Sequence, residues 1–295
     1  MIKNLYQKHV STAALVCAFR GALSYDDSHP LSGLFKDKYA SKLCGFPLTC
    51  AFLFPPLTLS LFFLTFRKLI PGSAVILVRA YYMEKQLAEQ VRQGVNQYVM
   101  VAAGMDSFLL RKRGLAEKMT VFEVDLPQIQ QEKKQKLTKL GCHFPSNYHF
   151  VSADLARQSL KESLQDHGFD FGKKAFFSLM GLIYYLPKAS FLEMMKGIAE
   201  ASVAGTMVIF DFLYDDASLN DSQKAWKSDC SDMVSSCGED FIYDTSAHQL
   251  EKDLADLGYH QESMMSLQDL YPSIGLDDHP TAGPSCFGIA VFSVK

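Results

Sequence analysis

The sequence has little net charge and no long basic run. Its 29 basic and 32 acidic residues leave a net charge of −3. Nucleic-acid binding requires a clustered positive face, so we expect no nucleic-acid partner. Hydrophobic residues make up 48% and charged residues 21% of the 295 positions. These values are typical of a soluble globular protein with one large domain or two small ones.

Paired cysteines are also missing. The seven cysteines include no CxxC pair, and none is grouped with histidines at the spacing of a zinc site. In a chain of this length, such a set indicates buried thiols in a reducing compartment rather than a disulfide framework. We therefore expect a cytoplasmic location and no metal site.

The longest uncharged stretch is broken by proline. Residues 43–66 carry no charge and are long enough to cross a bilayer, but Pro47, Pro55 and Pro56 interrupt them. The N-terminus lacks the pattern of a secretory signal. We expect buried helices or an apolar wall over a pocket here, and no membrane partner.

Short apolar runs alternate with amphipathic stretches from about residue 79 onward. The runs lie at 98–103, 119–124, 148–151, 175–180 and 207–212, and helical patterns separate them at 107–117, 127–140, 155–166 and 188–201. A further helix is expected from residue 246, followed by strands at 259–261 and 287–294. This alternation predicts an α/β fold with a doubly wound, mostly parallel, seven-stranded Rossmann-like sheet.

Two regions do not follow this alternation. Residues 1–78 are rich in proline, phenylalanine and leucine, and we expect them to form a helical cover over a domain at 79–295. Residues 213–245 are expected to form an inserted loop or lid. Together with 43–66, Trp226 and Tyr243 of this insertion are predicted to wall an apolar substrate pocket.

The turn after the first predicted strand is the expected ligand site, because open parallel sheets bind ligands beyond the carboxyl ends of their strands. Gly104 in this turn allows a ligand to approach the backbone closely. A carboxylate at the end of the second strand is expected to bind a ribose. Glu123 and Asp125 lie 19 and 21 residues after Gly104 and are both candidates.

The composition of this turn argues against a dinucleotide. A dinucleotide site has three glycines and a helix N-terminus that faces phosphate. Here one glycine is followed by Asp106, whose charge would repel phosphate. An adenosine ligand with an ammonium group, such as S-adenosylmethionine, suits Asp106 better. Asp106 is also a common N-cap residue, and both interpretations stay open.

Five segments occur in the order and spacing of one protein family. They are Arg79-Ala-Tyr-Tyr-Met, Ala102-Ala-Gly-Met-Asp-Ser, Phe122-Glu-Val-Asp-Leu-Pro, Ala153-Asp-Leu and Gly181-Leu-Ile-Tyr-Tyr-Leu-Pro, with Gly238-Glu-Asp-Phe farther downstream. The sequence over about residues 30–295 resembles the leucine carboxyl methyltransferase family. These are class I S-adenosylmethionine-dependent methyltransferases, and they include bacterial O-methyltransferases of secondary metabolism.

The resemblance implies a set of residues that bind the cofactor. Arg79 would pair with the methionyl carboxylate, Asp125 would bind the ribose hydroxyls, and Asp154 with Leu155 would hold the adenine. The full set implied by the resemblance and the turn is Arg79, Ala102, Ala103, Gly104, Asp106, Asp125, Leu126, Asp154, Leu155, Met180, Gly181 and Tyr185.

Two residues depart from the family pattern. Ala102 stands where the family usually has glycine, and its methyl group would crowd the cofactor. Met180 replaces a glutamate that helps to hold the ammonium end of the cofactor. These departures would weaken binding, alter cofactor preference or remove activity.

The expected activity is O-methyl transfer from S-adenosylmethionine to a carboxylate or hydroxyl of a small, apolar or aromatic acceptor, with S-adenosylhomocysteine as product. A protein carboxylate is a less favoured substrate. We assign no catalytic base, because none of the eight histidines lies in a recognisable motif. A catalytically silent cofactor-binding relative is the alternative. A nicotinamide-dependent oxidoreductase is less favoured, because the sequence lacks a GxGxxG turn.

Overall fold

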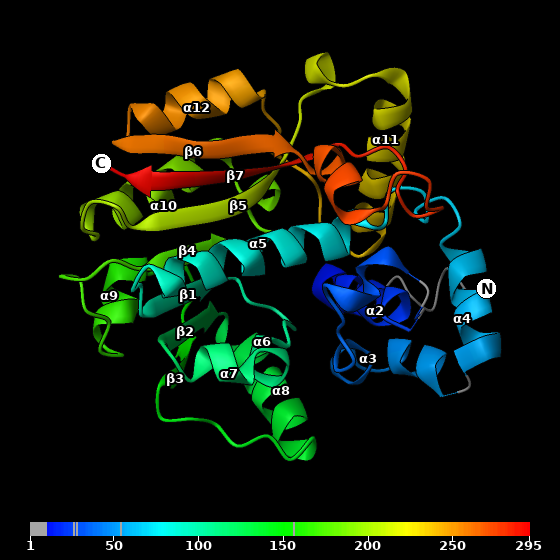
Figure 1. The fold of residues 1–295 in the computed structure, drawn as a ribbon, viewed down its shortest axis with the longest axis horizontal. Coiled ribbons are helices and arrows are strands. Elements are labelled where there is room, and N and C mark those ends of the chain that lie inside the picture. Colours follow the sequence, from blue (N-terminus) through cyan, green and yellow to red (C-terminus); the bar gives the residue numbers. More distant parts are fainter. Residues whose placement is uncertain (1–10, 26, 28, 54, 156) are drawn as a thin grey trace.

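A computed structural model describes residues 11–25, 27, 29–53, 55–155 and 157–295. A seven-stranded sheet crosses the molecule in the order β3-β2-β1-β4-β5-β7-β6 (Figure 1). The strands are β1 (Gln97–Val101), β2 (Thr120–Asp125), β3 (Tyr148–Ser152), β4 (Phe176–Leu179), β5 (Met207–Leu213), β6 (Tyr259–Ser266) and β7 (Phe287–Val294). All pairings are parallel except those of β7 with β5 and β6. The predicted α/β fold is confirmed.

Helices alternate with the parallel strands as predicted, and a further helix, α5, precedes β1. They are α5 (Val75–Arg92), α6 (Phe108–Arg111), α7 (Arg113–Ala116), α8 (Pro127–Lys139), α9 (Leu160–Gln165), α10 (Lys188–Glu200), α11 (Asp221–Ser236) and α12 (Ala247–Ala255). The helix expected at 107–117 is two short helices, and the one expected at 155–166 begins only at Leu160. The insertion at 213–245 contains α11.

Proline and glycine set the ends of α8 as the sequence predicts. Pro127 opens the helix, where the missing backbone N–H costs no hydrogen bond. Gly141 follows the helix with a φ of 72°, a conformation that glycine adopts without a steric penalty. Strands β5 and β7 are buried along their whole length, as expected of central strands covered on both faces.

The N-terminal segment lies beyond the carboxyl ends of the parallel strands (Figure 1). It contains α2 (Thr12–Leu23), η1 (Pro30–Gly33), α3 (Ala40–Leu43), η2 (Leu48–Phe52) and α4 (Pro55–Thr65). The expected boundary at residue 79 falls inside α5, which packs against both α2 and β4. The division into a cover and a domain stays an expectation.

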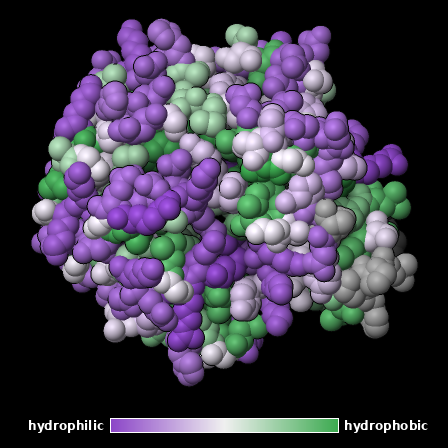
Figure 2. Space-filling model, in the orientation of Figure 1, coloured by the Kyte–Doolittle hydropathy of each residue, from purple (hydrophilic) through white to green (hydrophobic). Residues whose placement is uncertain are grey.

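Helix α4 packs on α2 with one face and exposes apolar side chains on the other. The rings of Phe62 and Phe66 lie 5.0 and 5.4 Å from that of Phe19 on α2. Leu61 and Leu64 are more than half exposed, and Figure 2 shows hydrophobic atoms gathered in the region of α4. Among the described residues, no helix is both long and apolar enough to cross a membrane.

A buried ion pair joins α8 to the sheet. Lys133 Nζ lies 2.5 Å from Glu123 Oε1, and the Tyr148 hydroxyl donates to Glu123 Oε2 at 2.6 Å. Burial raises the pKa of Glu123, although Lys133 and Tyr148 oppose this effect. Glu123 does not line the cavity described below, so it is not the ribose-binding candidate.

Replacing Lys133 is expected to destabilise the fold strongly, because it leaves the Glu123 carboxylate buried without a cation. We expect Lys133→Met to lower the free energy of unfolding by about 3 kcal/mol. Lys139→Met, at an exposed position of the same helix, should change it by less than about 0.5 kcal/mol. Urea denaturation measures both. Equal stabilities of the two variants would contradict this role of the pair.

Candidate functional site

A cavity of about 310 Å³ opens at the carboxyl edge of the parallel strands. Helices α2 and α5, the ends of β1, β2 and β4, and the chain after α11 surround it. Ten of the twelve residues predicted from the sequence line it: Arg79, Ala102, Ala103, Gly104, Asp106, Asp125, Leu126, Met180, Gly181 and Tyr185. The cavity lies between β1 and β4, where the strand order reverses, as expected for this fold.

Asp125 is fixed by backbone donors at the end of β2. Its Oδ2 accepts from the N–H of Gly104 at 2.6 Å, and its Oδ1 accepts from the N–H of Leu126 at 2.7 Å. Burial raises the pKa of this carboxyl group, and the two N–H groups counteract the shift. Each carboxylate oxygen has a second lone pair, so the fixed group can still accept hydrogen bonds from a diol.

Ala102 occupies a backbone conformation that favours glycine. Its φ is 55°, and it is the only described residue other than glycine with a positive φ. A β-carbon in this region crowds the neighbouring carbonyl and costs about 1–2 kcal/mol. Gly104, two residues later, also has a positive φ of 51° but carries no such penalty.

Arg79 reaches the cavity from α5 and is held by a buried carboxylate. Its Nη1 lies 2.5 Å from Asp211 Oδ2 on β5 and donates to the Tyr184 hydroxyl at 2.9 Å. Asp211 Oδ1 also accepts from the N–H of Gly181 at 2.6 Å. Burial lowers the pKa of Arg79, but the charge of Asp211 raises this pKa above its usual value, so the guanidinium stays charged. Asp211 was not predicted from the sequence, where its only signal is an acidic residue inside an apolar run.

The charge of Asp106 is already neutralised by two arginines. Its carboxylate lies 2.7 Å from Arg20 Nη1 on α2 and 3.3 Å from Arg111 Nη2, and it accepts from the N–H of Phe108 at 2.6 Å. Burial opposes the shift, but Arg20 and Arg111 hold the pKa of Asp106 well below its usual range. Asp106 lies one residue before the N-cap, Ser107, where its carboxylate binds the first N–H of α6 and anchors α2. These contacts leave it poorly suited to the ammonium group expected from the sequence.

Glu239 is a cavity residue that the sequence analysis did not select. It lies in the Gly238-Glu-Asp-Phe segment after α11, and the Thr12 hydroxyl at the start of α2 donates to its Oε2. Burial and the nearby charge of Glu239 raise the pKa of Tyr185, so the tyrosine hydroxyl is protonated at neutral pH. Met180 lines the same cavity with an uncharged side chain.

Several predicted residues are not among those that line the cavity. Asp154 and Leu155 follow β3 at the same edge of the sheet, and Asp154 faces Arg157 at 3.5 Å. Their role with adenine stays a prediction. The described residues of 43–66, together with Trp226 and Tyr243, do not line the cavity either. Phe62, Trp226 and Tyr243 are buried in the core, whereas Leu61 and Leu64 are exposed. The cavity wall comes from α2 and α5 instead.

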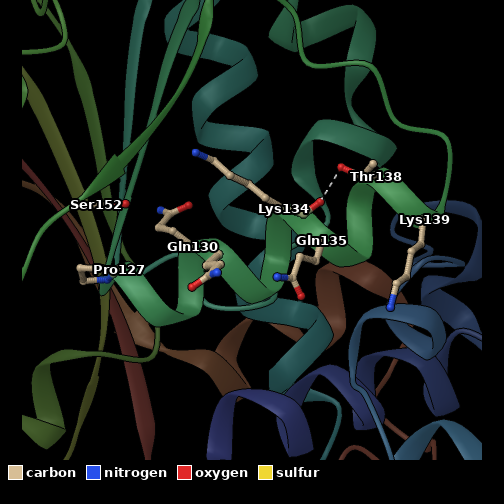
Figure 3. Close-up of a pocket in the computed structure, with 8 residues that line it drawn as sticks. Pro127, Gln130, Lys134, Gln135, Thr138, Lys139 and Ser152 are labelled. Atoms are coloured by element: carbon tan, nitrogen blue, oxygen red, sulfur yellow. Dashed lines mark hydrogen bonds between the residues drawn. The ribbon is translucent and has the colours of Figure 1, made fainter.

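A second depression of about 540 Å³ lies along the outer side of α8. Figure 3 shows mainly polar side chains there, including Gln130, Lys134 and Lys139, with the Thr138 hydroxyl donating to the Lys134 carbonyl at 2.9 Å. None of the residues predicted to bind a ligand lines this depression, so the smaller cavity is the candidate site.

Curated proteins similar to this chain are named for one activity. The "Putative S-adenosyl-L-methionine-dependent methyltransferase YktD" of Bacillus subtilis (strain 168) is 36% identical over 136 residues, which are 46% of this chain and 44% of that protein. A protein with the same functional description from Mycobacterium marinum is 28% identical over 203 residues, or 68% of this chain and 66% of that one. The matches thus span about half to two thirds of these relatives. S-adenosylmethionine, expected from the sequence, is the cofactor named for them.

Solved structures share the fold over nearly the whole chain. A crystal structure titled as a methyltransferase from Thermobifida fusca matches with a TM-score of 0.61 at 16% identity, covering 97% of this chain and 95% of that one. A protein of Streptomyces avermitilis matches with a TM-score of 0.65 at 10% identity, covering 98% and 100%. These likenesses show the fold alone. The profile of one family, Leucine carboxyl methyltransferase, matches residues 14–199. On this match over more than half of its length, the chain belongs to the leucine carboxyl methyltransferase family.

Proposed function

We propose that the chain binds S-adenosylmethionine in the 310 Å³ cavity and methylates an oxygen of a small acceptor, releasing S-adenosylhomocysteine. The observation that carries this proposal is the placement of Asp125 and Arg79 in one cavity. They supply a carboxylate suited to a ribose diol and a guanidinium suited to an amino-acid carboxylate. No single segment of the chain brings these two groups together.

The residues fit the cofactor at both ends. At the adenosyl end, Asp125 is held by the N–H groups of Gly104 and Leu126 and keeps acceptor capacity. At the methionyl end, both contacts of Arg79 with Asp211 and Tyr184 use Nη1. The Nη2 atom of Arg79 lies beside Gly181: a β-carbon added to this glycine would be 3.4 Å from Nη2. Arg79 can therefore donate from Nη2 to the methionyl carboxylate.

Methyl transfer requires the protein mainly to align the acceptor oxygen with the methyl group and the sulfur. S-adenosylmethionine supplies a methyl group on a sulfonium sulfur, and the acceptor oxygen forms a C–O bond as the C–S bond breaks. The cavity walls align the acceptor and exclude water. No histidine is among the described residues that line the cavity. This favours an acceptor that is already ionised, a carboxylate, because it needs no general base.

The acceptor is expected to be apolar apart from the methylated group. Val16 from α2 and Ile76, Ala80 and Met83 from α5 line the cavity, and their spacing places the three α5 residues on one helix face. Apart from the Met83 sulfur, which accepts from the Tyr98 hydroxyl at 3.4 Å, these side chains form no hydrogen bonds. They support the expected small, apolar or aromatic acceptor, and a folded protein substrate is less favoured.

A catalytically silent cofactor-binding protein is the second candidate. The positive φ of Ala102 strains the turn that contacts the cofactor, and Met180 provides no charge. This candidate binds S-adenosylmethionine and S-adenosylhomocysteine but produces none of the latter with any carboxylate or phenol acceptor. Chromatographic detection of S-adenosylhomocysteine over a panel of acceptors separates the two functions.

Substitutions at the two ends of the site should separate in their effects on binding. We expect Asp125→Asn to lower the affinity for S-adenosylmethionine, S-adenosylhomocysteine and methylthioadenosine alike, by ten- to a hundredfold, because all three ligands carry the ribose. Arg79→Lys keeps the charge that Asp211 needs. This variant should bind S-adenosylmethionine and S-adenosylhomocysteine more weakly but methylthioadenosine with unchanged affinity, since methylthioadenosine lacks the amino-acid group. Isothermal titration calorimetry measures each affinity.

Matched variants control for general effects of these changes. Asp166→Asn and Arg113→Lys alter exposed groups of the same types away from the cavity and should leave all three affinities unchanged. Failure of the wild-type chain to bind S-adenosylmethionine or S-adenosylhomocysteine would refute the proposed function. Stabilisation by NAD alone would indicate an oxidoreductase instead.

Ala102→Gly is expected to relieve the strain of the turn after β1. The gain from removing a left-handed alanine exceeds the entropic cost of glycine, so the free energy of unfolding should rise by about 0.5–1 kcal/mol. Ala103→Gly, at the neighbouring position without a positive φ, should lower it by a similar amount. Thermal and urea unfolding test both changes, and a loss of stability in Ala102→Gly would contradict the strained conformation.

A further inference from the structure

The charged side chains that line the cavity differ in how they are paired. Asp106 lies against Arg20 and Arg111, and Arg79 lies against Asp211. Asp125 forms no ion pair within the described part of the chain, but the N–H groups of Gly104 and Leu126 donate to its carboxylate. Glu239 also lines the cavity, and among the described residues no lysine, arginine or histidine forms an ion pair with its carboxylate. The Thr12 hydroxyl donates a hydrogen bond to Oε2 of this carboxylate. A half-buried carboxylate in a cavity is thus left without a cation.

Contacts with the turn after β4 hold Glu239 at the Arg79 end of the cavity. The N–H of Ile242 donates to the Tyr184 carbonyl at 2.9 Å, and the Phe241 ring lies 5.2 Å from that of Tyr184. Tyr184 in turn contacts Arg79 through its hydroxyl. The chain segment that contains Glu239 therefore contacts Tyr184, which also contacts the Arg79 guanidinium.

We propose that Glu239 binds the α-ammonium group of the methionyl arm of S-adenosylmethionine, an inference that rests on the proposed function. The carboxylate and ammonium groups of this arm share one carbon atom, so a site for one places the other within a few ångströms. Arg79 suits the carboxylate. Met180 carries no charge, Asp106 is already paired, and Asp125 is assigned to the ribose, which leaves Glu239 to provide the negative charge.

The Thr12 contact gives Glu239 a second part in ligand binding. Thr12 is the first residue of α2, so its hydrogen bond joins the N-terminal cover to the chain after α11 across the cavity. A carboxylate has lone pairs for both the threonine hydroxyl and an ammonium group. Ligand binding at Glu239 therefore also secures the start of α2 over the methionyl arm.

The test compares two ligands that differ only in the ammonium group. One is S-adenosylhomocysteine and the other is its deaminated analogue, which keeps the carboxylate. We expect Glu239→Gln to weaken binding of S-adenosylhomocysteine by ten- to a hundredfold and to leave the analogue within twofold of wild type in calorimetric titrations. Arg79→Lys should weaken both ligands, because both carry the carboxylate. Asp240→Asn, the neighbouring exposed residue, should weaken neither.

The outcomes separate this inference from the proposed function. If wild type binds neither ligand, the proposed function fails. If wild type binds S-adenosylhomocysteine and Glu239→Gln binds it equally well, the role of Glu239 is refuted while the function stands. If Glu239→Gln weakens both ligands to the same extent, Glu239 shapes the cavity without contacting the ammonium group, and the inference is also overturned.

Discussion

The buried ion pair between Arg79 and Asp211 is the interaction on which the arrangement of the site depends. Asp211 is fully buried in β5, where an unpaired carboxylate would cost several kcal/mol. The guanidinium of Arg79, the Tyr184 hydroxyl and the Gly181 N–H all satisfy it. The same group thereby holds α5 against the sheet, fixes the turn after β4 and keeps the Arg79 guanidinium at the cavity.

A second set of charges fixes the cover over the cavity. Arg20 of α2 lies 2.7 Å from both Asp37 and Asp106, and Arg111 lies 2.5 Å from Glu84 on α5. These groups are largely buried, so their mutual attraction is little screened by water. Because α2 forms one wall of the cavity, this network links the stability of the N-terminal segment to the shape of the site.

The alternation of apolar runs and amphipathic stretches located the strands, because a sheet covered on both faces imposes that pattern. The edge strand β6 is mostly only partly buried, and it continues to Ser266, beyond the expected 259–261. Asp125 was predictable for the same reason, since its position follows from the end of a strand. The roles of Arg20, Asp211 and Glu239 were not predictable from the sequence, because they depend on the long-range packing of α2, β5 and the chain after α11 around the cavity. The described residues of 43–66 do not line the cavity, and the Phe62 ring packs on Phe19 instead.

The central claim is that Asp125 and Arg79 bind opposite ends of one S-adenosyl ligand. A crystal structure of the chain with S-adenosylhomocysteine tests it most directly. The account predicts both ribose hydroxyls within hydrogen-bond distance of the Asp125 carboxylate and the amino-acid carboxylate beside Arg79 Nη2. A ligand bound along α8, or one whose ribose makes no contact with Asp125, would contradict it.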